Sequence, residues 1–310
     1  MLDSLIKTIL CVLLFVCITG AKADAQKSNT YAIREINNLS YYNIDSLDSD
    51  LTQINLIIPE GVENPPVFMW VGGGAWAYVD RHREMDLCRA MAKQGILMVS
   101  VGHRLSPKLL GQTKVYEGVK HPAHVTDLAH AFRWVYDHAD EYGYAKENIF
   151  VGGYSSGSHL SAMLASNGEF MKAVGLSTSD IKAIVPVGGG FDIPHYRQSL
   201  IEEDSSYLEN HIYPVFGETE EEQIAASPMT FIDDFNTPML LISESDTYPY
   251  NVLFEKALSD LGRKNYQVLN CHNETHNSLW TKLSKDEDCI YRDYIVAYIL
   301  SMSGEPKTEN

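Results

Sequence analysis

The sequence predicts an α/β fold in which a mostly parallel, doubly wound sheet carries helices on both faces. Short, continuous apolar runs, which are typical of strands covered on both sides, alternate with segments whose apolar residues recur at helical spacing. Glycine runs at 72–74 and 188–190 close two of these apolar runs. Strands that alternate with helices in this way form parallel sheets whose crossovers are helical.

The expected elements follow one another along most of the chain. Strands are expected at 31–36, 51–59, 67–71, 96–101, 149–151, 181–187, 239–243 and 266–269, and helices at 83–94, 125–142, 158–165 and 291–302. The first two strands alternate apolar and polar residues, which is typical of an antiparallel pair. We therefore expect them to form a leading antiparallel hairpin before the parallel strands.

Residues 192–236 interrupt this alternation because they contain no clear strand. They include an acidic run at 218–222, and several aromatic residues lie in or beside the segment: Phe191, Tyr196, Tyr207, Tyr213 and Phe216. We expect a small helical cap over the carboxyl edge of the sheet, facing a substrate; a solvated surface loop is the alternative. The whole of residues 26–310 is otherwise expected to form a single domain.

The first 25 residues differ from the rest of the chain. Lys7 precedes an apolar run at 8–19, and small residues at 21–25 offer cleavage sites, which is the pattern of a secretory signal. The run is short for a membrane span, so we expect no stable membrane insertion after the signal is removed. An uncleaved anchor is the alternative. The protein is therefore expected to be secreted or periplasmic.

Charge and cysteine content exclude several classes of partner. The 310 residues contain 24 Lys and Arg against 41 Asp and Glu, so the formal net charge is −17. Such a chain is a poor binder of nucleic acid or anionic membranes, and a neutral or small partner is expected. Beyond the signal, the spacing of Cys88, Cys271 and Cys289 resembles no zinc site, and no metal is expected. An exported protein permits a Cys271–Cys289 disulfide, but sequence does not set its geometry.

The strongest chemical signal is Gly153-Tyr154-Ser155-Ser156-Gly157, which stands between an apolar strand and a small-residue helix. In that context the serine occupies a strained turn, where bulky neighbours would collide with strand and helix. Ser155 would stand exposed at the carboxyl end of a central strand and at the positive end of a helix dipole. We therefore identify Ser155 as the candidate nucleophile.

A serine nucleophile also needs a base, an acid that orients the base, and donors for the developing oxyanion. The glycine run at 72–74 follows a strand and can turn bare backbone N–H groups towards a ligand. Together with the serine motif further along the chain, it predicts an oxyanion hole made by the amides of Gly73, Gly74 and Ser156.

With these motifs the chain resembles the α/β-hydrolases, in the esterase branch related to hormone-sensitive lipase, arylformamidases and bacterial feruloyl and acetyl-xylan esterases. The resemblance covers roughly residues 50–300 and implies the α/β-hydrolase fold. It depends on the order and spacing of four motifs: Val71-Gly72-Gly73-Gly74-Ala75-Trp76, His103-Arg104-Leu105-Ser106-Pro107, His121-Pro122-Ala123 with Asp127, and Gly153 to Leu160.

The chain departs from the family pattern at two positions. Val71 stands where the oxyanion motif usually has histidine, and His103 stands where the second motif usually has tyrosine. The family histidine orients the oxyanion loop rather than reacting, so the resemblance implies an altered rigidity of this loop and not a loss of chemistry.

The order serine, acid, histidine along the chain is typical of this fold and points to the acid. Asp246 lies just beyond the strand at 239–243, and together with Pro249 it matches the Asp-x-x-Pro arrangement of the family. Glu244 is the alternative. The acid would accept a hydrogen bond from the histidine and fix its tautomer.

The resemblance places the base in the loop after the last strand. His276 precedes Ser278-Leu279, as the family histidine commonly does, and His272 is the alternative. Because the pKa of an unperturbed imidazole lies near the working pH, His276 can take the proton of Ser155 and return it to the leaving group. His159 and Ser158 are expected to be structural and to pack the helix after Ser155 against the sheet.

Together these residues predict a serine carboxylesterase that cleaves a short-chain, acetyl or aryl-acyl ester through an acyl-enzyme, without a cofactor. Its substrate is expected to be a small molecule or a glycan-linked ester. Two alternatives stay open. One is an amide hydrolase of the arylformamidase kind, which a secretory signal disfavours; the other is a catalytically silent homologue that binds a ligand.

Overall fold

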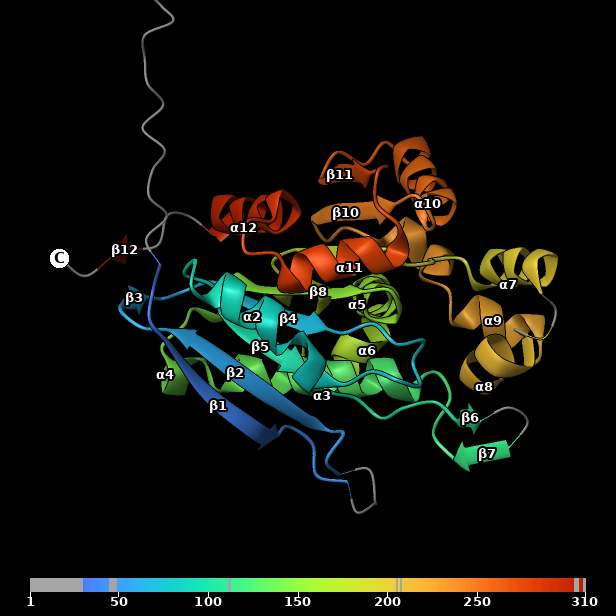
Figure 1. Cartoon of the computed structure of the whole chain (residues 1–310), viewed down its shortest axis with the longest axis horizontal. Coiled ribbons are helices and arrows are strands. Elements are labelled where there is room, and N and C mark those ends of the chain that lie inside the picture. Colours follow the sequence, from blue (N-terminus) through green and yellow to red (C-terminus); the bar gives the residue numbers. More distant parts are fainter. Residues whose placement is uncertain are drawn as a thin grey trace, which may run out of the picture.

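The computed structural model describes residues 30–44, 49–110, 113–204, 206, 208–303 and 307–308. The expected signal at 1–25 and the aromatic residue Tyr207 lie outside the described residues. An eight-stranded sheet forms the centre of the molecule (Figure 1), with the strand order β1-β2-β5-β4-β8-β9-β10-β11.

The sheet is mixed at one edge and parallel elsewhere. Its strands are β1 (Ile33–Ser40), β2 (Gln53–Pro59), β4 (Val67–Val71), β5 (Leu97–Val101), β8 (Ile149–Tyr154), β9 (Ile184–Val187), β10 (Met239–Glu244) and β11 (Tyr266–Cys271). The pairs β1–β2 and β2–β5 are antiparallel, and all other neighbours are parallel. The expected antiparallel pair and the mostly parallel sheet are thus confirmed.

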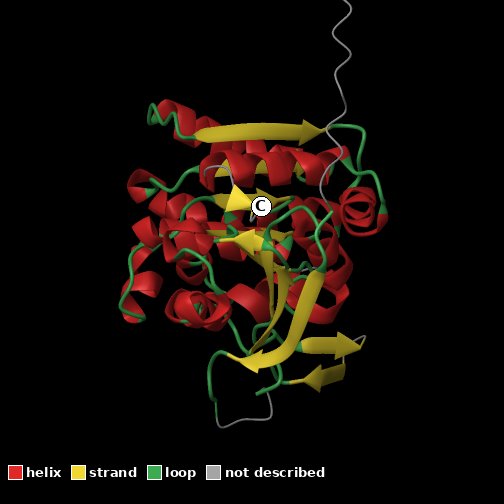
Figure 2. Cartoon of the chain, turned by 90° about the vertical axis from the view of Figure 1, so that its left-hand side faces the viewer, coloured by secondary structure: helices red, strands yellow, loops and turns green. Residues whose placement is uncertain are grey.

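Helices cover both faces of this sheet (Figure 2). On one face α3 (Ala123–Asp137), α5 (Ser156–Ser166) and α10 (Tyr248–Asp260) pack against one group of buried side chains. On the other face α2 (Met85–Ala92), α11 (His276–Lys285) and α12 (Ile290–Ser303) pack against a second group. Successive strand residues point to opposite faces, so Met69 belongs to the first core and Phe68 to the second. The sheet therefore separates two apolar cores.

Shorter elements complete the described chain. The helical ones are η1 (Arg81–Glu84), α4 (Ala139–Tyr142), η2 (Lys146–Asn148), α6 (Gly168–Ala173) and η3 (Thr178–Asp180). Two small antiparallel pairs are β3 (Val62–Glu63) with β12 (Lys307–Thr308), and β6 (Lys108–Leu110) with β7 (Thr113–Tyr116). No helix of the described residues combines the length and the apolar content that a membrane crossing requires.

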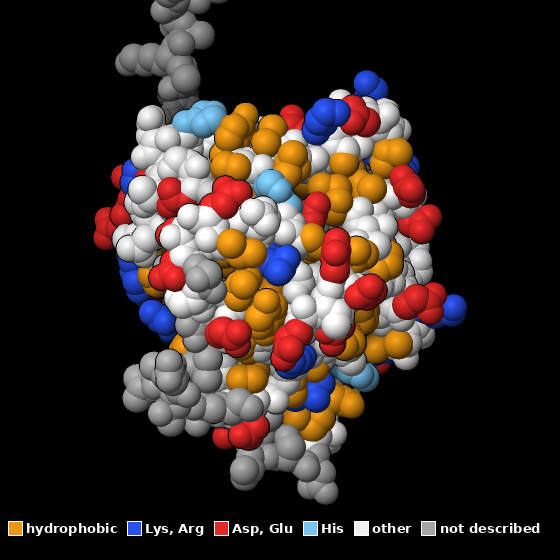
Figure 3. All heavy atoms as spheres, turned by 90° about the vertical axis from the view of Figure 1, so that its right-hand side faces the viewer, with side chains coloured by type: hydrophobic (Ala, Val, Ile, Leu, Met, Phe, Trp, Pro, Cys, Tyr) orange, Lys and Arg blue, Asp and Glu red, His pale blue; other side chains and the backbone are white. Residues whose placement is uncertain are grey.

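The segment between β9 and β10 is helical where it is described. It contains α7 (Ile193–Glu203), η4 (Leu208–Ile212), α8 (Tyr213–Phe216), α9 (Glu220–Ala225) and η5 (Pro228–Asp234). These helices lie beyond the carboxyl ends of the central strands, at the right of Figure 1. Acidic side chains are spread between apolar ones over this face of the molecule (Figure 3).

The cysteines of the described chain are all free thiols. Cys88, Cys271 and Cys289 are buried, and none of them forms a disulfide. Burial is the main reason why the pKa of Cys271 is raised to about 12, with the nearby Glu274 adding to it. All three side chains belong to the second apolar core.

Candidate active site

Ser155 sits at a sharp turn between β8 and α5. Its backbone has φ 55° and ψ −114°, a conformation that L-residues rarely adopt. The backbone N–H of Ser155 donates to the carbonyl oxygen of Val187 over 2.8 Å, which ties the turn to β9. The strand, the strained serine and the helix thus adopt the sharp-turn geometry that is expected for this motif.

Close backbone packing explains the glycines around this serine. A Cβ atom at Gly157 would lie 2.1 Å from the carbonyl oxygen of Val71, so α5 rests directly on the end of β4. A Cβ atom at Gly73 would lie 3.0 Å from the Cβ of Ser155. The glycine run after β4 therefore lies against Ser155, where its amides are expected.

A buried carboxylate, that of Glu84, packs against the loop after β4. Glu84 is 2% exposed, and its Oε2 accepts a hydrogen bond from Nε1 of Trp70 over 2.8 Å. Gly72 lies directly above it, since a Cβ there would be 2.7 Å from Oε1 of Glu84. Burial raises the pKa of Glu84, although the bond from Trp70 partly opposes this. Val71, at the family's histidine position, is fully buried.

The same loop is connected to the helices beyond the sheet through His159. Nε1 of Trp76 donates to Nδ1 of His159 over 3.3 Å, and Nε2 of His159 donates to the carbonyl oxygen of Ala226 over 2.8 Å. Both bonds fit one neutral tautomer, and burial lowers the pKa of His159 to about 3. His159 is thus structural, but it joins the loop to the helical segment rather than packing α5 on the sheet.

His276 is the first residue of α11, and its ring faces a buried carboxylate. Nδ1 of His276 lies 2.7 Å from Oε1 of Glu244, whose side chain is 0% exposed. Glu244 also accepts from the backbone N–H and the hydroxyl of Thr247, each over 2.8 Å. Burial by itself would raise the pKa of Glu244, but the bonds from His276 and Thr247 outweigh it and lower this pKa. A ring that donates from Nδ1 leaves Nε2 as a proton acceptor.

Tyr154 supports the imidazole from one side. The two rings stack with their centroids 4.9 Å apart and their planes 28° apart, and the tyrosine hydroxyl donates to the carbonyl oxygen of His276. Burial, reinforced by the charge of Glu244, raises the pKa of Tyr154, which keeps the hydroxyl a donor. This contact could not be predicted from the sequence, because nothing in the motif shows where the residue before Ser155 points.

The structure corrects the expected position of the acid. Asp246 does not meet the ring; its Oδ2 accepts the backbone N–H of His276 over 2.7 Å. Glu244, the alternative, is the last residue of β10 and reaches the imidazole from inside the sheet, whereas Asp246 lies in the turn beyond it. His272, the alternative base, is exposed and its ring packs against Tyr248 instead.

Two cavities meet at Ser155 and His276. The first measures about 400 Å³ and also contacts Gly73, Gly74 and Trp280; we call it the Trp280 cavity. The second measures about 600 Å³ and extends towards α7 and α10; we call it the cap cavity. Every residue expected in the site lines at least one of them: Gly73, Gly74, Ser155, Ser156, Asp246 and His276.

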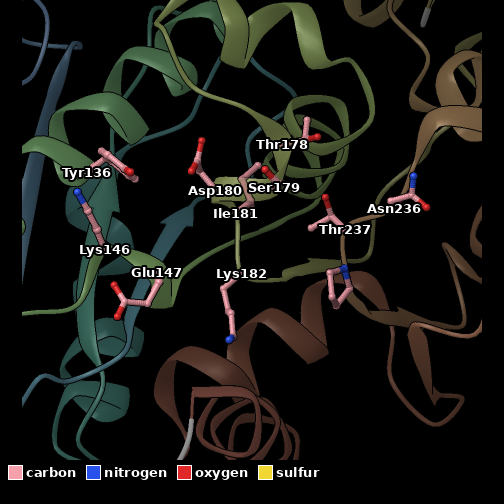
Figure 4. Close-up of a pocket in the computed structure, with 11 residues that line it drawn as sticks. Tyr136, Lys146, Glu147, Thr178, Ser179, Asp180, Ile181, Lys182, Asn236 and Thr237 are labelled. Atoms are coloured by element: carbon pink, nitrogen blue, oxygen red, sulfur yellow. The ribbon is translucent and has the colours of Figure 1, made fainter.

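A third cavity, of about 500 Å³, lies at the amino ends of β9 and β10 (Figure 4). Residues such as Lys146, Ser179, Lys182 and Thr237 line it, and none of the expected site residues does. Since Ser155 follows the carboxyl end of the parallel strand β8, this cavity is at the opposite edge of the sheet. Within the described residues, no group of three or more His, Cys, Asp or Glu side chains is arranged to hold a metal ion.

The other two sequence motifs have structural partners. Arg104 and Asp127 form an ion pair at 2.6 Å in which the carboxylate is fully buried, and the backbone N–H of Arg104 donates to the same carboxylate. Nδ1 of His103 lies 2.6 Å from the carbonyl oxygen of Arg104, and the ring of His103 packs edge-on against His124. These contacts fix the chain after β5 against α3.

Comparison with known proteins identifies the family of this chain. The BD-FAE family model matches residues 54–249, which is more than half of the chain. The chain belongs to the BD-FAE family. Carboxylic ester hydrolases are among the curated relatives of this BD-FAE family member. Esterase LipQ of Mycobacterium tuberculosis is 25% identical over 221 residues, covering 68% of this chain and 50% of that protein. A probable isoprenylcysteine alpha-carbonyl methylesterase of Arabidopsis thaliana is 24% identical over 252 residues, covering 75% and 50%.

Solved structures show the fold of this BD-FAE family member. Esterase B from Lactobacillus rhamnosis matches with a TM-score of 0.71 at 16% identity, covering 97% of this chain and 96% of that one. A truncated carbohydrate esterase from gut microbiota matches with a TM-score of 0.65 at 19% identity, covering 89% and 98%. The fold is therefore that of the α/β-hydrolases. The chain spans about half of the length of each of these two curated relatives, the mycobacterial esterase and the Arabidopsis methylesterase.

Proposed function

We propose that this BD-FAE family member is a serine carboxylesterase that works through an acyl-enzyme. The observation that carries the proposal is the arrangement around His276. Its ring is held by the buried carboxylate of Glu244, and it lines the same two cavities as the strained serine Ser155. A serine that opens into a cavity, beside a base fixed by an acid, is what nucleophilic acyl transfer requires.

The reaction proceeds in two halves. Oγ of Ser155 attacks the acyl carbon while Nε2 of His276 takes its proton, and Glu244 stabilises the imidazolium that forms. Backbone N–H groups of Gly73, Gly74 and Ser156 donate to the oxyanion. His276 then protonates the departing alcohol, and the ester is left on Ser155. In the second half water attacks this ester with His276 as base, which releases the acid and restores the serine hydroxyl.

The helical segment 193–234 is proposed to act as a cap that shapes the substrate site. Tyr196 of α7 lines the cap cavity together with Tyr250 of α10, and the two rings meet edge to face at 5.5 Å. Aromatic walls of this kind bind the flat faces of sugars and aryl groups, so we propose a small-molecule or glycan-linked ester as substrate.

A Ser155→Ala variant tests the proposed function. We expect kcat for 4-nitrophenyl acetate to fall by at least about 10³-fold, because the attacking oxygen is removed. Ser179→Ala, on the exposed surface at the far cavity, is the matched control and should retain the parent rate. Labelling by a fluorophosphonate should follow the same pattern.

Three outcomes separate the remaining alternatives. A parent protein that neither turns over esters nor reacts with the fluorophosphonate would be a catalytically silent homologue. Faster turnover of N-formylkynurenine than of acetylated or feruloylated sugars would indicate an arylformamidase-like amide hydrolase. Full activity of Ser155→Ala would defeat the assignment of the nucleophile.

Export is a separate proposal, supported by the pattern of Lys7, the apolar run at 8–19 and the small residues at 21–25. Amino-terminal sequencing of the protein recovered from the cell envelope or medium should give a start near residue 25. A chain that keeps its first residues would instead be anchored or retained.

A further inference from the structure

The exposed charged side chains of the two cavities that meet at Ser155 have opposite signs. In the Trp280 cavity the side chain of Arg83 lines the wall together with Tyr78 and Trp280. In the cap cavity the charged side chains are the carboxylates of Glu203 and Asp246. An ester bound at the serine places one of its halves in each cavity, so each half meets a field of different sign.

Arg83 is available to a ligand. It is exposed, and its guanidinium forms no ion pair with another residue of the described chain. The adjacent Glu84 also lines the Trp280 cavity, but its carboxylate is buried under Gly72 and is bonded to Trp70. The charge of Arg83 lowers the pKa of Glu84, but burial is the larger influence and raises it.

A second cation extends the positive charge beyond Arg83. Nζ of Lys108 lies 5.9 Å from the ring centroid of Tyr78, and both residues line a neighbouring cavity of about 380 Å³ to which Arg83 also contributes. The remaining charged side chains of that cavity are engaged locally. Asp80 accepts the backbone N–H of His82, and Arg81 donates to Asn38 and Gln53. In a chain of net charge −17, this is a local concentration of positive charge.

We propose that Arg83 selects esters in which one half bears a carboxylate, and that this half occupies the Trp280 cavity. The other half, in the cap cavity, is an uncharged group, since Glu203 and Asp246 repel an anion there. Arg83 is suited to this role because a guanidinium holds a carboxylate through two parallel hydrogen bonds, and the aromatic walls accept the apolar stem between the ester and the charge. This inference rests on the proposed esterase activity.

The test compares matched charged and neutral esters. One series places the charge on the acyl side, as methyl hydrogen adipate against methyl hexanoate; the other places it on the alcohol side, as 4-acetoxybenzoate against 4-methylphenyl acetate. Acid release is followed in a pH-stat at low salt. In one of the two series we expect the charged ester to have the higher kcat/KM. Arg83→Gln should lower the ratio of charged to neutral kcat/KM about tenfold, and Arg83→Lys should retain part of it.

The controls separate a specific contact from a general charge effect. Arg133→Gln removes a cation from α3, where Arg133 pairs with Asp137 away from both cavities, and should leave the ratio unchanged. A parent that prefers the neutral ester in both series, or a ratio that Arg83→Gln does not change, would overturn the proposal while the esterase activity stands. Failure to hydrolyse any ester, with no fluorophosphonate labelling, would overturn both.

Discussion

Two carboxylates hold His276 at different atoms. Glu244 binds the ring nitrogen Nδ1, and Asp246 binds the backbone N–H at the start of α11. The second contact also suits the helix, because a negative charge at the amino terminus of a helix is stabilised by its dipole. Only the contact of Glu244 can set the tautomer of the imidazole, so the two residues have separable effects.

We therefore expect Glu244→Gln and Asp246→Asn to differ in their effect on turnover. Glu244→Gln removes the charge that stabilises the imidazolium, and kcat should fall by about 10²–10⁴-fold. Asp246→Asn keeps an oxygen that accepts the His276 amide, and kcat should fall by less than about tenfold. The measurement is kcat for 4-nitrophenyl acetate in folded variants. The reverse order of effects would return the acid role to Asp246.

Single residues were predictable where a motif surrounds them. Ser155 and His276 each stand in a recognisable local pattern, and the structure brings both to the same two cavities. The sequence pattern could not decide which residue pairs with His276, because Glu244 and Asp246 lie two positions apart at the end of the same strand. Which of them reaches the ring depends on the path of the turn and on side-chain length, and neither is visible in the sequence.

At the scale of elements, His159 connects three parts of the molecule. It belongs to α5, accepts from Trp76 in the loop after β4, and donates to Ala226 at the end of α9. The segment 193–234 is attached elsewhere too: the backbone N–H of His121 donates to the carbonyl oxygen of Val215, over 2.7 Å. The segment 193–234 and the loop after β4 are therefore positioned by the same buried side chain.

Replacing His159 by Leu should loosen the cap and lower stability. The change leaves Nε1 of Trp76 and the carbonyl oxygen of Ala226 buried without this partner, at a cost of about 1–3 kcal/mol for each group. Urea unfolding should report a loss of this order, and limited proteolysis should cut more rapidly within 193–234. His272→Leu, at an exposed histidine, is the control and should change stability by less than about 0.5 kcal/mol. Equal losses in both variants would contradict the linking role.

The elements themselves were predicted unevenly. Buried strands such as β4 and β8 were predicted because each is a continuous apolar run between glycines or polar turns. The helix α10 was missed; its apolar residues are spread around the helix, and Pro249 near its start is equally typical of a turn. Helices were expected in 192–236 from the lack of strands alone, so their bounds could not be predicted.

At the scale of the whole molecule, several histidines are buried in neutral form. Burial lowers the pKa of His121 to about 4 and that of His159 to about 3, and it also lowers the pKa values of His103 and His124. The unfolded chain therefore binds protons at a higher pH than the folded chain does. The stabilisation that these neutral histidines provide is therefore complete above pH about 6.5, the pKa of histidine in the unfolded chain. It is lost as the pH falls towards their lower pKa values in the folded protein.

We accordingly expect the free energy of unfolding to decrease between pH 6.5 and pH 4. Each such histidine contributes about 1.4 kcal/mol per pH unit in this window. His121→Leu should make this decrease with falling pH less steep, because the variant takes up about one proton fewer on unfolding. Burial lowers the pKa of His121, and a leucine carries no charge to bury. Urea unfolding at several pH values measures both slopes. Identical slopes in parent and variant would show that His121 does not titrate on unfolding.

The fold class could be predicted from the sequence, but the order of the strands in the sheet could not. Alternation of buried runs and helical segments predicts a parallel doubly wound sheet, but it does not say that β4 lies between β5 and β8. That neighbourhood decides the site, because it sets the loop after β4 beside the serine after β8.

The contact between Gly157 and Val71 has a wider consequence. The strand β4, which leads into the glycine run, and the helix that follows Ser155 touch through bare backbone, with no room for a methyl group between them. The spacing of the reactive framework is thus independent of the side chains around it. Substitutions in α7, α10 or the stretch near Arg83 can therefore alter the substrate preference without moving β4 relative to α5. Among related proteins, we expect changes of substrate preference to be found in those regions and not at the contact between Gly157 and Val71.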